Sequence, residues 1–224
     1  MGEILKLKKH HKLIVAADGS AASGKTTGAK IISKKYGLTF LSSGLLYRYA
    51  SFQLLKNKPK NRINFLKKCF KKLSLQKLNN KNLHHPEISS YTSIIAKEKK
   101  IRIILKAFQK KFAKKNNKVC IEGRDIGTVI LPHADIKFFF KCSLDVAAKR
   151  RFKELKKNNK KIKLAEVKKA MRIRDNLDKK RKNSPLIQAE NAVLVQTDKL
   201  KNITGMVNKM SEKIEKKIKD KYGS

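Results

Sequence analysis

Short apolar runs recur along the chain, and longer segments with apolar residues at helical spacing lie between them. We predict the runs to be buried strands, at residues 13–17, 38–41, 118–122, 136–142 and 192–197. The predicted helices lie at about 24–36, 42–56, 62–73, 87–115 with a break near 99, and 144–182, and another closes the chain. Alternating strands and helices favour an α/β fold, a parallel sheet with helices on both faces. Such sheets bind ligands at the carboxyl ends of their strands.

The stretch "DGSAASGKTT" joins the first predicted strand to the first predicted helix. It contains the pattern G-x-x-x-x-G-K-S/T, in which backbone N–H groups and the helix N-terminus converge on phosphate oxygens. Lys25 is expected to reach the β- and γ-phosphates, and the Thr26 hydroxyl to ligate Mg²⁺. The motif predicts a nucleoside triphosphate site and leaves the acceptor open. Its residues are Gly19, Ser20, Ala21, Ala22, Ser23, Gly24, Lys25, Thr26 and Thr27.

Two further motifs follow the second and third predicted strands. "SSGLLYR" places Ser43 and Arg48 at the start of a helix, a combination that suits a second phosphate. "EGRDIGT" begins with Glu122, which stands where a phosphate-loop protein needs a carboxylate near the metal and its waters. Arg124 and Asp125 are expected to point the same way out of the sheet.

A fourth motif, "RDNLDKKRKNSPL", lies at the end of the long helical segment. Arg174, Asp178 and Arg181 recur at spacings of four and three residues, so we predict that they share one helix face. An intrahelical ladder of salt bridges explains that face as well as a binding role does.

Composition adds a net charge of +40, from 57 basic and 17 acidic residues. Such a charge suggests an anionic partner, but the lysines are scattered over nearly every segment and are expected to form solvated faces. No specific nucleic-acid partner is therefore expected. Only 9 of the basic residues are arginines, and we expect these where a planar bidentate fork is needed. The three cysteines are widely spaced and predicted to be reduced thiols.

In chain order, "DGSAASGKTT", "SSGLLYR", "EGRDIGTVILPHADIKFFF" and "RDNLDKKRKNSPL" resemble the successive signatures of the bacterial cytidylate kinases. The resemblance runs from about residue 12 to 200, and the last two motifs are its specific part. It implies a phosphate-loop sheet of five parallel strands with a helical lid. The implied division is a core of 12–56, 116–148 and 184–224, a nucleoside-monophosphate lobe at about 57–115, and a lid at about 149–183.

The resemblance also implies an activity, ATP-dependent phosphorylation of CMP and dCMP to CDP and dCDP, with Mg²⁺. We expect a cytoplasmic protein, since no apolar run approaches the roughly 18 residues of a membrane helix. We also expect a monomer. The implied catalytic residues are Lys25, Arg48, Arg124, Arg150, Arg151 and Arg181. The implied metal contacts are Thr26 and, through water, Glu122.

The resemblance assigns the acceptor as follows. The CMP phosphate is assigned to Ser43, Arg48, Arg124 and Arg181, the ribose to Arg174 and Asp178, and the cytosine to Ser93, Arg102 and Asp125. Arg150 and Arg151 are placed on the lid over ATP. The chain departs from the family pattern at Ser42, where Asp is usual, and in the segment 60–90, which is shorter and more basic.

Two other functions stay open at this point. The first is a kinase for another acceptor, such as UMP, AMP, shikimate or a nucleoside. The second is a nucleic-acid-stimulated ATPase with the positive charge as its footprint, although few aromatic residues are interleaved for base stacking. A non-catalytic nucleotide sensor is disfavoured by the intact Lys25 and Thr26.

Overall fold

The structure is a computed structural model, and it describes residues 7–157, 160–200 and 202–223. Contacts divide the described chain into two compact units, each treated by itself below. Unit 1 comprises Met1–Leu41 with Asn116–Ser224, and unit 2 comprises Ser42–Lys115. Residues 42–56, which we assigned to the core, belong to unit 2 by this division because their helix packs on the other helices of that unit.

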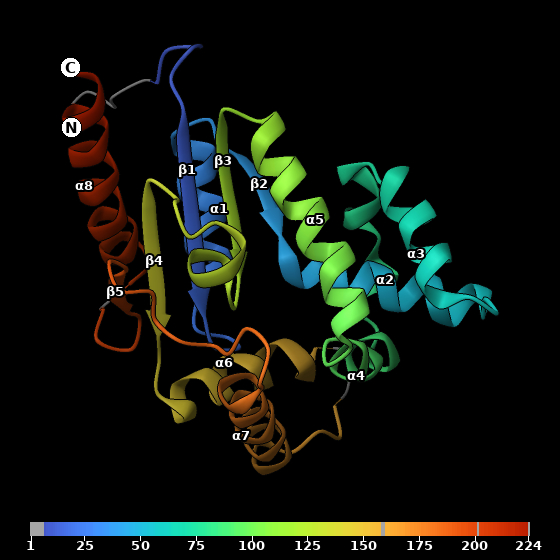
Figure 1. The fold of residues 1–224 in the computed structure, drawn as a ribbon. Helices are drawn as coiled ribbons and strands as arrows, with labels where there is room; N and C mark the ends of the chain where they lie inside the picture. The colour runs from blue at the N-terminus through green and yellow to red at the C-terminus, as the bar shows by residue number, and fades with distance from the viewer. Residues whose placement is uncertain (1–6, 158–159, 201, 224) are drawn as a thin grey trace. The chain divides into compact units, whose positions relative to one another are not determined.

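Unit 1 is built on the sheet, in which the strand order is β2-β3-β1-β4-β5 (Figure 1). The pairings of β1 with β3, of β1 with β4 and of β4 with β5 are parallel. The predicted fold class is confirmed, and each predicted strand is present to within two residues of its expected ends. The strands are β1 (Leu13–Gly19), β2 (Thr39–Ser42), β3 (Lys118–Gly123), β4 (Ile136–Lys141) and β5 (Val193–Gln196).

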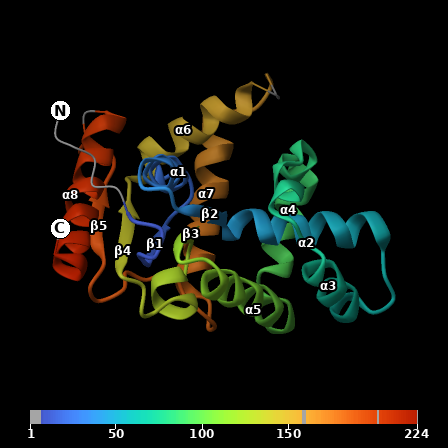
Figure 2. The ribbon, with the colours of Figure 1, turned by 90° about the horizontal axis from the view of Figure 1, so that it is seen from above.

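Two helices of unit 1, the first and the last, pack on this sheet. The helices of this unit are α1 (Lys25–Lys35), α6 (Leu144–Lys156), α7 (Leu164–Lys180) and α8 (Ile203–Tyr222), with a short π-helical turn η3 (Ile126–Ile130). Figure 2 shows α8 beside β4 and β5, and both strands contact it. The segment 144–182, predicted to be helical throughout, is two helices, α6 and α7, which pack on each other.

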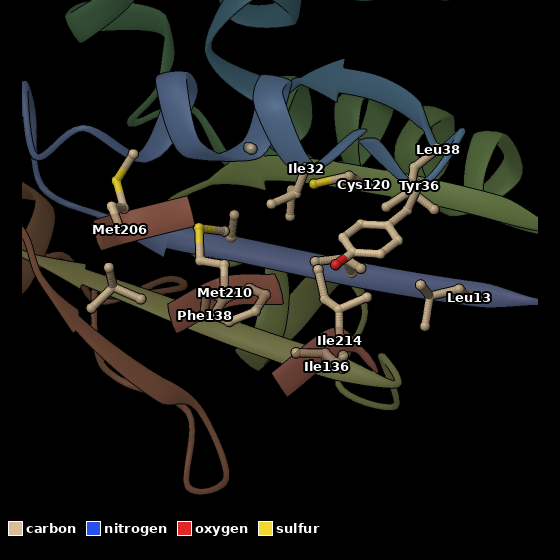
Figure 3. Close-up of a cluster of buried hydrophobic side chains, with 14 of the residues drawn as sticks. Leu13, Ile32, Tyr36, Leu38, Cys120, Ile136, Phe138, Met206, Met210 and Ile214 are labelled. Atoms are coloured by element: carbon tan, nitrogen blue, oxygen red, sulfur yellow. The ribbon is translucent and has the colours of Figure 1, made fainter. Parts of the chain in front are cut away.

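One apolar cluster joins α1 and α8 to the sheet. Ile32 of α1 and Met210 of α8 meet Phe138 of β4, and all three are almost completely buried (Figure 3). Burying a side chain of this size stabilises the fold by about 1.5–3 kcal/mol. The cluster anchors β1, so the loop that follows β1 starts from a rigid strand.

Unit 2 consists of helices and the short segments that join them, and its first residue ends β2. Its elements are α2 (Ser43–Asn57), α3 (Arg62–Lys71), the 3-10 turns η1 (Leu75–Asn79) and η2 (Lys81–His84), α4 (Pro86–Ile95) and α5 (Lys99–Lys115). The predicted break near residue 99 is therefore confirmed. Phe70 makes edge contacts with Tyr49 and Phe108, which tie α3 to α2 and α5.

Two composition-based predictions concern the chain as a whole. Cys69, Cys120 and Cys142 are unpaired, as predicted. Burial raises the pKa of the Cys120 thiol to about 12, so it stays protonated. In the described part of the chain no helix combines the length and the apolar character that crossing a membrane requires.

Candidate active site

The phosphate loop runs from the end of β1 to the start of α1. Gly19 has no room for a side chain, since a Cβ would lie 2.5 Å from the Phe140 carbonyl oxygen. Gly24 adopts a left-handed conformation at φ 84°, where glycine is favoured, and caps α1. Within the loop the Ser23 hydroxyl donates to the Ser20 carbonyl at 3.0 Å. The predicted loop therefore forms between a strand and a helix, with Thr26 exposed in the first turn of α1.

Lys25 lies over this loop and faces the end of β3. Its ammonium donates to the Ser20 carbonyl at 3.1 Å and stands 3.8 Å from a Glu122 carboxylate oxygen. Both side chains are buried. Burial, and next the charge of Arg124, lower the pKa of Lys25 to about 8. Glu122 thus lies beside Lys25, and Thr26 is the next residue along the chain.

This donor set suits Mg²⁺. Mg²⁺ prefers oxygen ligands, keeps several waters, and is commonly held by one or two protein groups together with substrate phosphates. A hydroxyl from Thr26 and a carboxylate from Glu122 meet that description. Among the described residues no cluster of three or more His, Cys, Asp or Glu side chains is present that could hold a metal by itself.

Arg124, Asp178 and Arg181 form a charged cluster beside the loop. Arg124 Nε donates to Asp178 Oδ2 at 2.9 Å, and its Nη1 donates to the Gly19 carbonyl. Arg181 Nη1 lies 3.4 Å from Asp178 Oδ1, and Arg181 Nη2 lies 3.9 Å from Asp125 Oδ1. Burial opposes ionisation of Asp178, but Arg124 and Arg181 outweigh it and hold its pKa below the usual value. The cluster therefore holds two guanidinium groups in fixed positions around one carboxylate.

The position of Arg181 corrects one prediction. Helix α7 ends at Lys180, and Arg181 has an extended conformation with ψ 135°, so it does not continue the helix face of Arg174 and Asp178. The Asp178–Arg181 pair nevertheless forms, because the chain turns back and Arg181 Nε donates to the Ser184 carbonyl. An intrahelical ladder therefore does not account for this pair, and Arg124, which follows β3, lies outside the helix as well.

Asp18, which the sequence analysis did not assign, joins β1 to the segment after β3. Its two carboxylate oxygens accept the backbone N–H groups of Ile126 and Gly127, at 2.8 and 2.7 Å. Asp18 is 4% exposed. The only signal in the sequence was that Asp18 is an acidic residue directly after an apolar strand. Such a residue could have been interpreted as a buried hydrogen-bond acceptor.

The two adjacent arginines of α6 have different surroundings. Arg150 donates to the hydroxyl and the carbonyl of Thr197, each at 3.0 Å. The Thr197 hydroxyl in turn donates to the Ser23 carbonyl at 2.9 Å, so Arg150 is tied to the phosphate loop. Arg151 instead pairs with Glu154 at 2.8 Å in an exposed position. Thr197, at the end of β5, is a second residue that the sequence analysis missed.

Helix α7 also contacts the loop directly. The Ala21 N–H donates to Asp175 Oδ1 at 3.5 Å, and Ala21 and Ala22 pack against an apolar cluster that includes Met171. Burial raises the pKa of Asp175. Asp175, the third missed residue, therefore occupies an N–H group that a phosphate oxygen could take.

In unit 2 the four predicted residues lie on α2, α4 and α5. Arg48 donates to the Leu83 carbonyl and to the Ser89 hydroxyl, both at 2.8 Å. The Ser93 hydroxyl donates to the Ser89 carbonyl at 3.4 Å, so Ser89 connects Arg48 to Ser93.

Arg102 joins the same helices through different contacts. It donates to the Ala96 carbonyl at 3.3 Å, and its guanidinium lies over the Tyr47 ring, 5.9 Å from the centroid. Ser43 is buried in the first turn of α2, just after Ser42, whose hydroxyl caps the helix by accepting the Leu45 N–H. Ser42 thus supplies the capping oxygen that the family's Asp would offer at this place.

Comparison with known proteins gives one consistent family. The sequence model of the family described as "Cytidylate kinase" matches residues 15–216. A cytidylate kinase from Thermosipho melanesiensis is 35% identical over 217 residues, covering 92% of this chain and 97% of the relative. A cytidylate kinase from Clostridium tetani is 36% identical over 220 residues, covering 92% and 96%.

Solved structures extend the likeness to the fold. A shikimate kinase from Bacteroides thetaiotaomicron superimposes with a TM-score of 0.51 at 14% identity, covering 91% of this chain and 98% of that chain. An uncharacterized protein from Eubacterium ventriosum gives a TM-score of 0.52 at 17% identity, covering 93% and 99%. At these identities the similarity concerns the architecture alone.

Proposed function

The chain belongs to the cytidylate kinase family, and from this premise we propose that it transfers the γ-phosphoryl group of ATP to CMP and dCMP. The products are ADP with CDP or dCDP. The enzyme is a nucleoside monophosphate kinase. Its monomeric state and cytoplasmic location stay predictions of the sequence.

The observation that carries the proposal is the charged cluster of Arg124, Asp178 and Arg181. A protein that only hydrolyses or senses a nucleoside triphosphate needs one anion site, and the phosphate loop supplies it. The cluster adds a second set of cations, and Arg124 is hydrogen-bonded to the Gly19 carbonyl at the start of the loop. A second phosphorylated substrate is the ligand that best uses both.

On the donor side, the phosphate loop binds the ATP phosphates and Lys25 bridges the β- and γ-phosphates. Arg150 stands ready next to the loop, since its Nη1 would lie 3.8 Å from a Cβ at Gly24. Arg151 must leave Glu154 to reach the phosphates. Thr26, and Glu122 through water, would hold Mg²⁺, which neutralises phosphate charge when bound.

On the acceptor side, a CMP phosphate oxygen attacks the γ-phosphorus in line. No strong general base is needed, because the acceptor phosphate is largely ionised at neutral pH. Catalysis is positioning and charge neutralisation, with Ser43, Arg48, Arg124 and Arg181 on the acceptor phosphate. Asp178 accepts from the ribose hydroxyls, with Arg174 beside it.

The base is recognised by its hydrogen-bonding edge. Cytosine offers an amino donor at N4, which suits the Asp125 carboxylate, and acceptors at N3 and O2, which suit Arg102 and Ser93. UMP carries a carbonyl in place of the amino group, so Asp125 discriminates against it.

The test is a coupled assay of ADP formation with purified protein, ATP, Mg²⁺ and a panel of acceptors. We expect CMP and dCMP to be the best acceptors, UMP and AMP to be poor, and shikimate and nucleosides to be inactive. Matched reactions that contain RNA or DNA but no acceptor test the competing function, a nucleic-acid-stimulated ATPase. Fast turnover of AMP with little of CMP, or ADP formation that nucleic acid stimulates in place of CMP, would contradict the proposal.

A further inference from the structure

We propose that Asp18 is a positioning residue for the acceptor, holding Arg124 and Asp125 in place from the end of the donor strand. The inference rests on the proposed function and adds a residue to it. Asp18 touches neither substrate. It acts through the backbone of η3, the turn that directly follows Arg124 and Asp125.

The first observation is that Asp18 caps a turn that belongs to another strand. The first N–H groups of a helical turn have no partner within it and need an acceptor. At η3 those groups belong to Ile126 and Gly127, and the two Asp18 oxygens accept one each, at 2.8 and 2.7 Å. Because the carboxylate is buried, water cannot easily take over this role.

The second observation concerns Asp125, which occupies the N-cap position of η3. An aspartate there commonly caps the turn with its own side chain. Here Asp125 makes no such bond, and its carboxylate lies 3.9 Å from Arg181 Nη2. Asp18 does the capping in its place. The Asp125 side chain can therefore serve the base and the neighbouring arginine.

The third observation is that the same strand end also holds Arg124. Arg124 donates to the carbonyl of Gly19, the residue after Asp18. Two consecutive residues of β1 thus make these contacts. Asp18 binds the backbone after Asp125, and Gly19 binds the side chain of Arg124. Gly19 also begins the phosphate loop. The positions of Arg124 and Asp125 are therefore fixed relative to the loop that binds ATP.

Gly127 fits this close approach. A Cβ at this position would lie 3.4 Å from Asp18 Oδ2 and 3.2 Å from Lys137 Cδ. A methyl group here would crowd the Lys137 methylenes, at 3.2 and 3.3 Å, and would meet Asp18 Oδ2 at an ordinary contact distance. Gly127→Ala therefore crowds the surroundings of the Asp18–Gly127 hydrogen bond without altering Asp18.

The principal variant is Asp18→Asn, which keeps the shape but turns an NH₂ toward one of the two N–H donors. We expect the KM for CMP to rise about tenfold or more and kcat to fall, because misplaced acceptor groups lose rate steeply. The KM for ATP should stay within about twofold, because the Asp18 side chain bonds to η3 and not to the loop. In hydrogen exchange of the free protein, peptides spanning 123–130 should exchange faster and those of α1 should not.

Asp135→Asn is the matched control. Asp135 also accepts a backbone N–H of β1, that of Ile14 at 2.7 Å, but at the opposite end of the strand. We expect it to leave both KM values unchanged. If Asp18→Asn does not fold, Gly127→Ala replaces it, with an expected rise of about threefold in the KM for CMP.

The inference would be overturned if Asp18→Asn raised the KM for CMP and the KM for ATP equally. It would also be overturned if the variant folded like wild type and raised neither KM. Both outcomes would leave the proposed function intact. Wild-type protein without CMP-dependent ADP formation would instead contradict the proposed function. In that case unchanged exchange over 123–130 in Asp18→Asn would still overturn the positioning role, and faster exchange there would support it.

Discussion

The two ends of β1 use the same interaction for different purposes. At the carboxyl end Asp18 accepts the N–H groups of Ile126 and Gly127, and at the amino end Asp135 accepts the N–H of Ile14. Around Asp18 lie Lys25, Arg124 and Asp125, three of the charged residues of the candidate site. Beside Asp135 lies the last turn of α8, whose Lys221 pairs with it at 2.7 Å.

The amino end is a clamp, which we define as His11, Asp135, Lys221 and Tyr222. The Tyr222 hydroxyl donates to the Lys12 carbonyl at 2.8 Å, and the Tyr222 ring stacks on His11 at 3.9 Å. Its groups pair with one another or with backbone that needs a partner. At the carboxyl end, by contrast, one carboxylate, that of Asp178, is shared by two arginines, Arg124 and Arg181. The difference teaches that arginines sharing one acid, rather than a buried carboxylate, distinguish the candidate site from a structural clamp.

The largest difference between the two ends of β1 is expected when an arginine is removed at the carboxyl end. We expect Arg124→Ala and Arg181→Ala each to lower CMP-dependent kcat by about 10²–10⁴-fold, because a preorganised charge facing the acceptor phosphate is lost. The coupled ADP assay measures this, and circular dichroism should show a folded protein. Near-normal turnover in both variants would remove these arginines from the site.

The second expected effect is on the pH dependence of stability. Burial raises the pKa of Asp18 to about 6, with Asp125 raising it further and Lys25 and the two N–H groups opposing. Between about pH 4 and pH 6 the folded state then holds a proton that the unfolded state releases, so stability falls as the pH rises through this window. The loss is roughly 2–3 kcal/mol.

Urea unfolding of wild type and Asp18→Asn at several pH values measures that slope. We expect the variant to lack the component due to Asp18. Parallel slopes for wild type and Asp18→Asn would contradict the assignment.

A smaller effect is expected on base selection. Asp125→Ala should reduce the preference for CMP over UMP by about tenfold in kcat/KM, the size of one lost hydrogen bond to a recognised group. Competition between the two acceptors at saturating ATP measures the ratio. An unchanged ratio would show that Asp125 does not read the base.

The smallest effect tests the clamp. Asp135→Asn should lower the free energy of unfolding by about 1 kcal/mol, because the Lys221 ion pair is lost while an oxygen remains for the Ile14 N–H. Urea unfolding measures the change, and kcat should be unaltered. A large loss of activity would mean that the two ends are coupled, and the contrast drawn above would fail.

Patterns that depend on neighbouring residues were predictable from the sequence. The strands follow from short apolar runs, and the phosphate loop follows from Gly19 and Gly24, whose positions admit no ordinary side chain or favour glycine. The assignments of Ser93, Arg102 and the acceptor arginines came from resemblance rather than from periodicity, and they stay predictions. Arg181 shows the limit of spacing, because the helix ends one residue before it.

By itself, then, the sequence determined the element order, the loop chemistry and the family. The tertiary structure alone decided that Asp18 meets Ile126 and Gly127, more than a hundred residues away, and that Thr197 links Arg150 to Ser23. The reason is that periodicity and backbone preferences act over a few residues. Which buried acceptor faces which donor depends on the strand order, and β1 lies between β3 and β4 only once the sheet has formed.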